Sequence, residues 1–353
     1  MSLPATMSGV QLTGHGGPET LVWSDTLPVP SPQKGWALVK VLAAGVNNTD
    51  INTRIGWYAR ENTGSTQDTH GASGDVEGGW SGALPFPLIQ GGDLCGKLVA
   101  LGPDTPGPAI GARVVCPNVQ PDPGSDSPVG YRVIGSEYDG AFAQYCAVPV
   151  GALYDVTRSP LSDVEIGAMP CAFGTAMGLV HRSGVAAKSQ VLVTGASGGV
   201  GMAAVSIAAH LGAEVTGLCH ADKAAFVKDA GASNTLDRDA QPPAQSYDIV
   251  IDLVGGPAFP ALLDALRPGG RYAVSGAIAG PIVEADLRTI YLNDLTLIGC
   301  TFQSPESFAA LVELINTGAI RPRIAQTFPL KDIALAQAAF AQKSHAGKLV
   351  LIP

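Results

Sequence analysis

Residues 191–201 read VLVTGASGGVG, and the fold follows from this stretch. A short β-branched run ends in a loop of small residues, and the apolar run MAAVSIAA follows at residues 202–209. This is the strand, turn and helix pattern that places a pyrophosphate at a helix N-terminus. Gly198 and Gly199 allow backbone N–H groups to approach phosphate oxygens, and Gly201 allows the helix to lie close to the strand. The stretch therefore predicts a dinucleotide site.

The neighbouring sequence has to support this prediction, because 44 of the 353 residues are glycine and an ordinary tight turn would produce the same glycine trio. A second short apolar run, EVTGLC at residues 214–219, lies where the next strand of a βαβ unit is expected. Further apolar runs at residues 249–252, 271–274 and 295–299 predict more strands. Together they predict a parallel sheet with helices between its strands.

Composition bounds the class of protein. With 353 residues, 46% hydrophobic and 14% charged, the chain is long enough for two domains with cores. A net charge of −9, a pI near 5.1 and the lack of any basic run argue against nucleic acid or an anionic membrane as partner. No apolar stretch reaches about 18 residues, and no signal peptide is recognisable, so we expect a cytoplasmic protein. The six cysteines are scattered and form no CxxC pair, which predicts reduced core thiols.

The flanking regions have a different character. Residues 10–155 are rich in short apolar runs and turns, which predicts a domain built from strands. Within them, residues 57–86 form a long irregular polar segment. This segment, with Trp57, Tyr58, His70 and Trp80, either closes over a substrate and supplies a donor or a stacking face, or is an insertion remote from the site.

The last fifty residues contain two predicted helices and a strand. Ser304 is a predicted N-cap with Pro305 in the first turn, and the helix runs to Asn316. A second helix is expected near residues 332–342, followed by a strand at residues 348–352 that returns to the first domain.

Several motifs recur in the order and spacing of a known family. They are GHGGPE at 14–19, AAGVNNTD at 43–50, GGDLCG at 91–96, GAFAQY at 140–145, the glycine loop, and GKLVL at 347–351. With them the chain resembles the medium-chain dehydrogenase/reductase superfamily, and within it the zinc-independent quinone oxidoreductase (zeta-crystallin-like) group. The resemblance implies an α/β protein with a GroES-like β-rich catalytic domain at residues 1–156 and 304–353. It also implies a Rossmann doubly wound parallel-sheet domain at residues 157–303, and a catalytic cleft between the two.

The sequence departs from the zinc enzymes of that superfamily at their metal ligands. Where those enzymes have a Cys, a His and a second Cys, this chain has Asn47, Gly92 and Cys171. A catalytic zinc takes three protein ligands, and glycine or a neutral amide replaces neither imidazole nor thiolate. The stretch at residues 117–131 also lacks the four cysteines of the structural zinc lobe. We therefore expect no metal.

The expected cofactor is NADP(H). Domains that prefer NAD usually end the second strand with a carboxylate, and here that position holds Cys219. Lys223 and Arg238 are placed to meet a phosphate, although solvated surface charges would give the same sequence. Because ligands lie at the carboxyl ends of strands, loop residues there are expected contacts, as are positions that the resemblance places near the cofactor. The candidate cofactor-binding residues are Thr175, Ser197, Gly198, Gly199, Val200, Gly201, Cys219, His220, Lys223, Arg238, Val254, Ala277, Ile278, Thr301, Phe302 and Lys348.

The candidate catalytic residues are Asn47, Thr49 and Asp50. Without a metal, hydrogen-bond donors have to polarise the acceptor carbonyl, and Asn47 and Thr49 match donor-bearing positions of the family. Asp50 is expected to hold the loop, and the alternative for residues 47–50 is ordinary turn chemistry, in which the side chains bond their own backbone. Quinone reductases of the group often carry an aromatic hydroxyl two residues after this Asp, where this chain has Asn52. The chain therefore departs from the quinone reductases at this position.

The resulting hypothesis is hydride transfer from NADPH to a quinone or an α,β-unsaturated carbonyl compound, without a catalytic metal. Two alternatives stay open, a zinc-type alcohol dehydrogenase and an NADPH-binding protein with little turnover. The expected partner is a small carbonyl or quinone substrate. We also expect a homodimer paired through the strand near residues 295–298, which would cover an exposed sheet edge.

Overall fold

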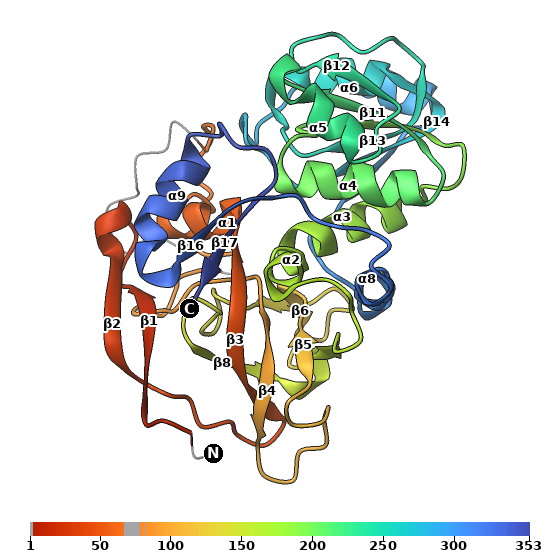
Figure 1. Ribbon diagram of the computed structural model, residues 1–353. Coiled ribbons are helices and arrows are strands. Elements are labelled where there is room, and N and C mark those ends of the chain that lie inside the picture. Colours follow the sequence, from red (N-terminus) through yellow and green to blue (C-terminus); the bar gives the residue numbers. More distant parts are fainter. Residues whose placement is uncertain (1–2, 67–77, 81) are drawn as a thin grey trace. The chain divides into compact units, whose positions relative to one another are not determined.

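The computed structural model describes residues 3–66, 78–80 and 82–353, and the chain divides into two compact units (Figure 1). Unit 1 comprises residues 3–62, 78–174 apart from 81, and 302–353, and unit 2 comprises residues 63–66 and 175–301. The candidate flap residue His70 lies outside the described residues.

Unit 1 is built on a seven-stranded sheet in the order β16-β17-β3-β4-β5-β9, with β8 also paired to β3. The whole of unit 1, this sheet included, contains the strands β1 (Thr6–Leu12), β2 (Leu21–Pro28), β3 (Trp36–Val46), β4 (Cys95–Leu101), β5 (Arg113–Val115), β6 (Val119–Pro121), β7 (Tyr131–Val133), β8 (Tyr145–Pro149), β9 (Tyr154–Asp155), β16 (Ile324–Pro329) and β17 (Lys348–Ile352). Its helices are α1 (Asn48–Arg54), α2 (Asp163–Gly167), the first part of α3 (Pro170–Ser183), α8 (Pro305–Thr317) and α9 (Ile333–Ala341).

The C-terminal strand β17 belongs to this sheet and lies between β16 and β3, so the chain returns to its first domain as the sequence predicted. β17 pairs antiparallel with β3, and Leu349 lies opposite Val46. This register places Lys348 beside the end of β3, where α1 begins. The side chains of both strands are almost entirely buried, which is why their apolar runs have few polar interruptions.

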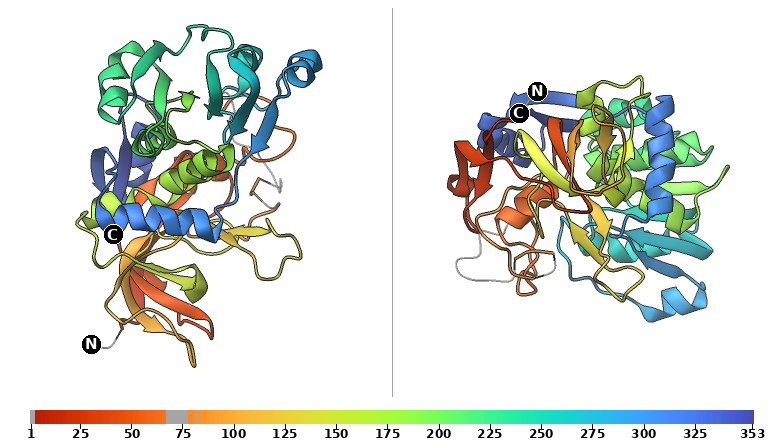
Figure 2. Two further views of the ribbon diagram at one scale, coloured as in Figure 1. Left: turned by 90° about the vertical axis from the view of Figure 1, so that its right-hand side faces the viewer. Right: turned by 90° about the horizontal axis from the view of Figure 1, so that it is seen from below.

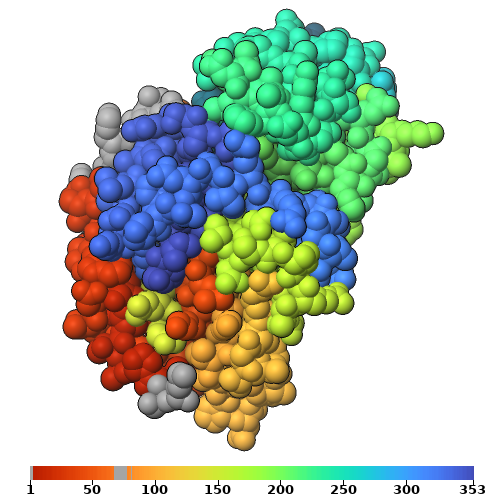
Figure 3. Space-filling view, viewed as in Figure 1, coloured from red at the N-terminus to blue at the C-terminus, as the bar shows by residue number. Residues whose placement is uncertain are grey.

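The two predicted C-terminal helices form close to their expected limits. The hydroxyl of Ser304 accepts a hydrogen bond from the Ser307 N–H (3.2 Å), so the predicted N-cap of α8 is present. The helix ends at Gly318 in a left-handed conformation (φ 67°) and is continuous along its length (Figure 2). Part of α9 lies on the outer surface of unit 1 (Figure 3). Its Leu335 side chain is 65% exposed.

Unit 2 contains a six-stranded parallel sheet in the order β12-β11-β10-β13-β14-β15. Because this order reverses direction between β10 and β13, the sheet is the doubly wound Rossmann arrangement that the glycine loop predicted. Its strands are β10 (Gln190–Val193), β11 (Glu214–Cys219), β12 (Asn234–Asp237), β13 (Tyr247–Asp252), β14 (Leu266–Val274) and β15 (Thr296–Gly299). Its helices are the second part of α3, α4 (Gly199–His210), α5 (Ala224–Asp229), α6 (Phe259–Asp264) and α7 (Leu287–Leu292).

The division between the units differs from the expected domain limits at residue 157. Residues 157–174, assigned to the cofactor domain from the sequence, lie in unit 1 because α2 packs on β3 and β4. A side chain on Gly167 would come within 2.7 Å of the Ala43 Cβ, so this packing depends on glycine.

Two further features concern the whole of the described chain. All six cysteines are free thiols and buried, in agreement with their scattered positions in the sequence. Among the described helices, none combines the length and apolar character needed to cross a bilayer.

Candidate active site

A buried ion pair in unit 1 organises the predicted catalytic residues. The Lys348 ammonium lies 3.1 Å from Asp93 Oδ2, and the two residues are 3% and 0% exposed. The ammonium also donates to the Val46 carbonyl (3.2 Å) and to Asn47 Oδ1. These three partners account for all three N–H donors of a lysine. Lys348, a candidate cofactor contact, therefore has no ammonium proton left for a cofactor phosphate.

Asp93 is satisfied on both oxygens. Its Oδ1 accepts from the backbone N–H of Cys171 (2.6 Å), and its Oδ2 also accepts from Asn47 Nδ2 (2.8 Å). Gly45 makes room for this carboxylate, because a Cβ there would lie 2.2 Å from Asp93 Oδ2. A buried charge is tolerated when it is paired and fully hydrogen-bonded, as this one is. Asp93 was not among the predicted site residues, although it is the one carboxylate of the motif GGDLCG at residues 91–96.

Asn47 has no donor to spare for a substrate. Its carbonyl oxygen accepts from Lys348, while its amide nitrogen donates to Asp93 and, at 3.4 Å, to the Gly45 carbonyl. The sequence predicted that Asn47 would polarise an acceptor carbonyl. The structure instead uses this amide to hold the ammonium and the carboxylate in place.

Asp50 holds the start of α1, the role that the sequence analysis favoured. Its carboxylate accepts from the Asn47 N–H (2.8 Å), and the two residues form a capping box. Gln90 fixes the same turn by donating to the Asp50 carbonyl (2.9 Å). Burial, with a further contribution from the charge of Asp93, raises the pKa of Asp50 to about 7.

Thr49 lies at the first turn of α1 and is only half-buried. Its hydroxyl oxygen accepts a hydrogen bond from the Tyr58 hydroxyl (3.1 Å) and another from the Trp80 indole N–H (2.9 Å). The Tyr58 and Trp80 rings pack at 5.3 Å between centroids. The described part of the 57–86 segment therefore contacts a predicted catalytic residue, which the sequence had left open.

The residues at the three zinc-ligand positions do not fit a zinc ion. Asn47 presents its oxygen to an ammonium, Gly92 has no side chain, and burial beside Asp93 raises the pKa of the Cys171 thiol. A Cβ on Gly92 would lie 2.4 Å from Asn118 Nδ2, so an imidazole has no room there unless Asn118 moves. Within the described ranges, no group of three or more His, Cys, Asp or Glu side chains has an arrangement suited to a metal.

The glycine loop of unit 2 has the predicted geometry. β10 ends at Val193, and α4 starts at Gly199 with Gly198 as its N-cap. A Cβ on Gly201 would lie 2.2 Å from the Gly195 carbonyl oxygen, so α4 approaches the loop as closely as only glycine permits. These residues, with Ser197 and Val200, fit a dinucleotide pyrophosphate.

A buried carboxylate links the strand ends around this loop. Asp252, at the end of β13, accepts from the Thr194 hydroxyl (2.5 Å), from the Tyr272 hydroxyl and from the Val254 N–H (2.9 Å). The Thr194 oxygen in turn accepts from the Leu253 N–H (2.9 Å). Asp252 is a positioning residue that the sequence analysis missed, although a carboxylate closing the apolar run IVID was a usable signal.

Some of the other predicted cofactor contacts lie at the same carboxyl edge, and others do not. The Val254 carbonyl accepts from the Ala279 N–H (2.9 Å), which brings the loop containing Ala277 and Ile278 beside the end of β13. Thr301 follows β15, and Thr175 lies on α3. Phe302 and Lys348 belong to unit 1.

Two cations lie near the end of β11. Cys219 is its last residue, and His220 caps the turn that contains Lys223. Partial burial, and then the positive charge of Arg238, lower the pKa of Lys223. Arg238, whose guanidinium lies 3.5 Å from Asp239, and Lys223 are two positive charges that a bound anion would stabilise.

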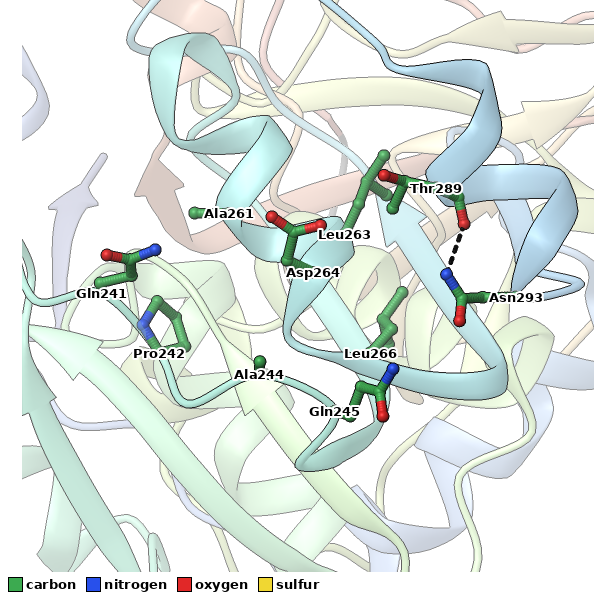
Figure 4. Close-up of a pocket in the computed structure, with 10 residues that line it drawn as sticks. All are labelled: Gln241, Pro242, Ala244, Gln245, Ala261, Leu263, Asp264, Leu266, Thr289 and Asn293. Carbon is green, nitrogen blue, oxygen red and sulfur yellow. Dashed lines mark hydrogen bonds between the residues drawn. The ribbon is translucent and has the colours of Figure 1, made fainter.

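Unit 2 also has a surface pocket, which lies away from the carboxyl ends of the strands (Figure 4). It is lined by Gln241, Pro242, Ala244, Gln245, Ala261, Leu263, Asp264, Leu266, Thr289 and Asn293. They lie just before β13, on α6 and at the start of β14, and on or just after α7. All of these segments lead into the amino ends of the parallel strands β13, β14 and β15. Ligands of open α/β sheets bind at the carboxyl ends, so this pocket is not the candidate site.

Comparison with known proteins agrees with both units. The family model described as alcohol dehydrogenase GroES-like domain matches residues 33–158, and the one described as zinc-binding dehydrogenase matches residues 199–317. A solved structure from Sinorhizobium meliloti 1021, with a provisional alcohol dehydrogenase assignment, is 39% identical, with a TM-score of 0.88, over 99% of this chain and 98% of that one.

Curated relatives cover nearly the whole chain at lower identity. Acryloyl-coenzyme A reductase of Sulfurisphaera tokodaii is 27% identical over 96% of this chain and 98% of its own length. Human quinone oxidoreductase is 27% identical over 98% of each chain, and proteins named NAD-dependent alcohol dehydrogenase also match. The chain therefore belongs to the medium-chain dehydrogenase/reductase superfamily of oxidoreductases, with a GroES-like unit and a nicotinamide-dinucleotide-binding Rossmann unit.

Proposed function

We propose that this protein is an NADPH-dependent reductase that transfers hydride to a quinone or an α,β-unsaturated carbonyl compound without a catalytic metal. The observation that carries the proposal is the Lys348 ammonium, bound to Asn47 Oδ1 and Asp93. A buried ammonium beside a ligand position repels a divalent cation and occupies the oxygen that would bind it. Relatives named acryloyl-coenzyme A reductase and quinone oxidoreductase support this class of acceptor.

The preference for NADPH is supported by the end of β11. Cys219 lacks the carboxylate that accepts from the ribose hydroxyls in NAD enzymes, and Lys223 and Arg238 would bind a 2′-phosphate. Residues 197–201 would hold the pyrophosphate, and Asp252 fixes the strand ends around them. The bound cofactor supplies the hydride, while these residues bind and orient it.

In unit 1 the polarising group is Thr49. As hydride reaches an activated acceptor, negative charge develops on its carbonyl or quinone oxygen, and a hydroxyl donor stabilises that charge. Asn47, Asp93 and Lys348 are already hydrogen-bonded to one another, so they act by fixing the turn that carries Thr49. A conjugated acceptor needs less polarisation than a simple ketone, which suits a site with a hydroxyl in place of a metal.

The first test compares substrates. Steady-state rates with NADPH should be clearly above background for 1,4-benzoquinone and methyl vinyl ketone and absent for ethanol oxidation, and extensive chelation should leave them unchanged. Ethanol turnover abolished by a chelator would establish the zinc alcohol dehydrogenase alternative instead. Tight NADPH binding with no turnover of any acceptor would favour a cofactor-binding protein.

The second test concerns the cofactor. Replacing both Lys223 and Arg238 with Ala should weaken NADPH binding at least about tenfold and leave NADH binding unchanged, since each cation contributes a charge-assisted hydrogen bond to the phosphate. Lys228→Ala, an exposed lysine on α5, is the matched control and should change neither affinity. Clearly tighter binding of NADH by the unmodified protein would overturn the NADPH assignment.

A further inference from the structure

The hydroxyl of Thr49 is held by two donors that arrive from different parts of unit 1. Trp80 donates its indole N–H to Thr49 Oγ1 at 2.9 Å, and Tyr58 donates its hydroxyl to the same atom at 3.1 Å. An indole nitrogen is only ever a donor, so the direction of the Trp80 bond is unambiguous. In the described part of the chain, both hydrogen bonds at Thr49 are therefore ones that its oxygen accepts.

A hydroxyl oxygen has two acceptor positions and one proton. With both acceptor positions occupied, Thr49 has only its proton left to offer, and the torsion of that proton is restricted to the remaining direction. A threonine without these donors would rotate its hydroxyl or donate to a nearby backbone carbonyl. Because the hydroxyl is already oriented before the acceptor binds, it does not have to rotate while negative charge develops on the acceptor oxygen during hydride transfer.

The aromatic neighbours keep both donors in place. The Tyr58 ring packs against Trp57 (5.5 Å between centroids) and against Trp80 (5.3 Å), and Trp80 also meets Tyr131 edge-on at 6.3 Å. Burial raises the pKa of Tyr58 to about 12, so its hydroxyl keeps its proton at neutral pH. The cluster joins α1, the turn after it and β7.

We propose that Trp80 is a positioning residue that, together with Tyr58, turns the Thr49 hydroxyl into an obligatory hydrogen-bond donor toward the acceptor oxygen. This inference rests on the proposed reductase function and specifies how its metal-free site works. Hydride adds to the electron-poor carbon, the electron pair of the conjugated system moves onto oxygen, and Thr49 donates to that oxygen. A proton from water then completes the reduction.

The test is a double-mutant cycle at Thr49 and Trp80, measured with NADPH and methyl vinyl ketone. Thr49→Val, which keeps the shape and removes the hydroxyl, should lower kcat about a hundredfold. Trp80→Phe, which keeps a ring and removes the N–H, should lower kcat about tenfold with KM and NADPH affinity unchanged. The double variant should be no slower than Thr49→Val alone, because Trp80 acts only through Thr49.

Trp36→Phe is the matched control, since Trp36 lies on β3 and packs against Tyr138 rather than Thr49. It should leave kcat unchanged. Independently of activity, the Trp80 indole N–H resonance, assigned by its loss in Trp80→Phe, should shift in Thr49→Val while the Trp36 resonance does not. This measurement also shows that each variant is folded.

The outcomes separate the inference from the function on which it rests. If the two substitutions lowered kcat multiplicatively, or if the Trp80 indole resonance did not shift in Thr49→Val, the positioning role of Trp80 would be wrong. The proposed reductase function would still stand. An unmodified protein without activity toward any quinone or enone would instead overturn the proposed function.

Discussion

Lys348 and Asp93 stand 255 positions apart in the chain and form one buried ion pair. A buried pair adds little net stability compared with apolar residues of the same size, but losing one partner leaves an uncompensated charge. At the scale of single residues, the stability of unit 1 therefore depends on keeping both partners of this pair.

Lys348→Met should lower the free energy of unfolding by about 3–5 kcal/mol, because Asp93 stays buried without its counter-charge. Urea unfolding of this variant and of the Lys348→Met, Asp93→Asn double variant measures the effect, and the double variant should recover part of the loss. Lys331→Met, at an exposed lysine, is the control. A single variant as stable as the unmodified protein would contradict the prediction.

Asp50 should make stability depend on pH. Burial raises its pKa from 3.8 to about 7, so the folded protein holds this proton more tightly than the unfolded chain does. The stabilisation is complete below about pH 4 and is lost as pH rises toward about 7, with a slope of at most about 1.4 kcal/mol per pH unit.

Asp50→Asn replaces the protonated carboxyl with a neutral amide and should remove this decline. Urea unfolding at several pH values between about 4 and 8 provides the comparison. The control is Asp126→Asn, at an exposed loop residue, which should keep the decline. The same slope in Asp50→Asn and in the unmodified protein would show that another group is responsible.

At the scale of elements, the contact between α4 and the glycine loop carries the cofactor site. The Cβ of an alanine at position 201 would lie 2.2 Å from the Gly195 carbonyl oxygen, and at position 198 its nearest neighbour would be that oxygen at 3.3 Å. Backbone at 2.2 Å has to move, whereas a contact of 3.3 Å needs only a slight adjustment.

Gly201→Ala should therefore destabilise the protein by about 1–3 kcal/mol and weaken NADPH binding. Gly198→Ala, whose φ of −79° suits alanine, should keep the thermal stability of the unmodified protein. Thermal unfolding and NADPH titration distinguish the two variants. Equal melting temperatures for both would contradict the packing argument.

At the scale of the whole molecule, we propose a homodimer formed through β15. This strand is the last of the unit 2 sheet and pairs only with β14 among the described strands. Large apolar side chains are exposed on it and on the preceding helix α7, namely Leu287 (69%), Tyr291 (62%), Leu292 (69%) and Leu297 (44%). An open, apolar sheet edge is normally covered in a soluble protein.

Leu297→Lys should convert the dimer to a monomer, because a charged side chain at a paired edge strand has to be buried without a partner. Light scattering after size-exclusion chromatography gives the mass directly. Leu335→Lys, at a side chain of α9 that is 65% exposed, should remain dimeric. A monomeric unmodified protein at micromolar concentration would rule out the proposed dimer.

The sequence by itself determined the Rossmann sheet, the glycine loop and the C-terminal strand, because their signals are local: runs of apolar residues, small residues where backbone must approach, and caps at helix ends. It was less accurate at the start of β14: the apolar run predicted a strand only at residues 271–274, whereas the strand begins at Leu266 and has an irregular first part. Strand propensity there is weak, and the register is imposed by β13.

The tertiary structure alone decided what the predicted catalytic residues do. Asn47 and Lys348 are 301 positions apart, and Thr49 and Trp80 are separated by 31, so no local pattern indicates that they meet. Whether an amide or a hydroxyl is free to donate depends on which partners already use its atoms, and that is settled only when distant segments pack together. The residue types were visible in the sequence, and their roles came from the fold.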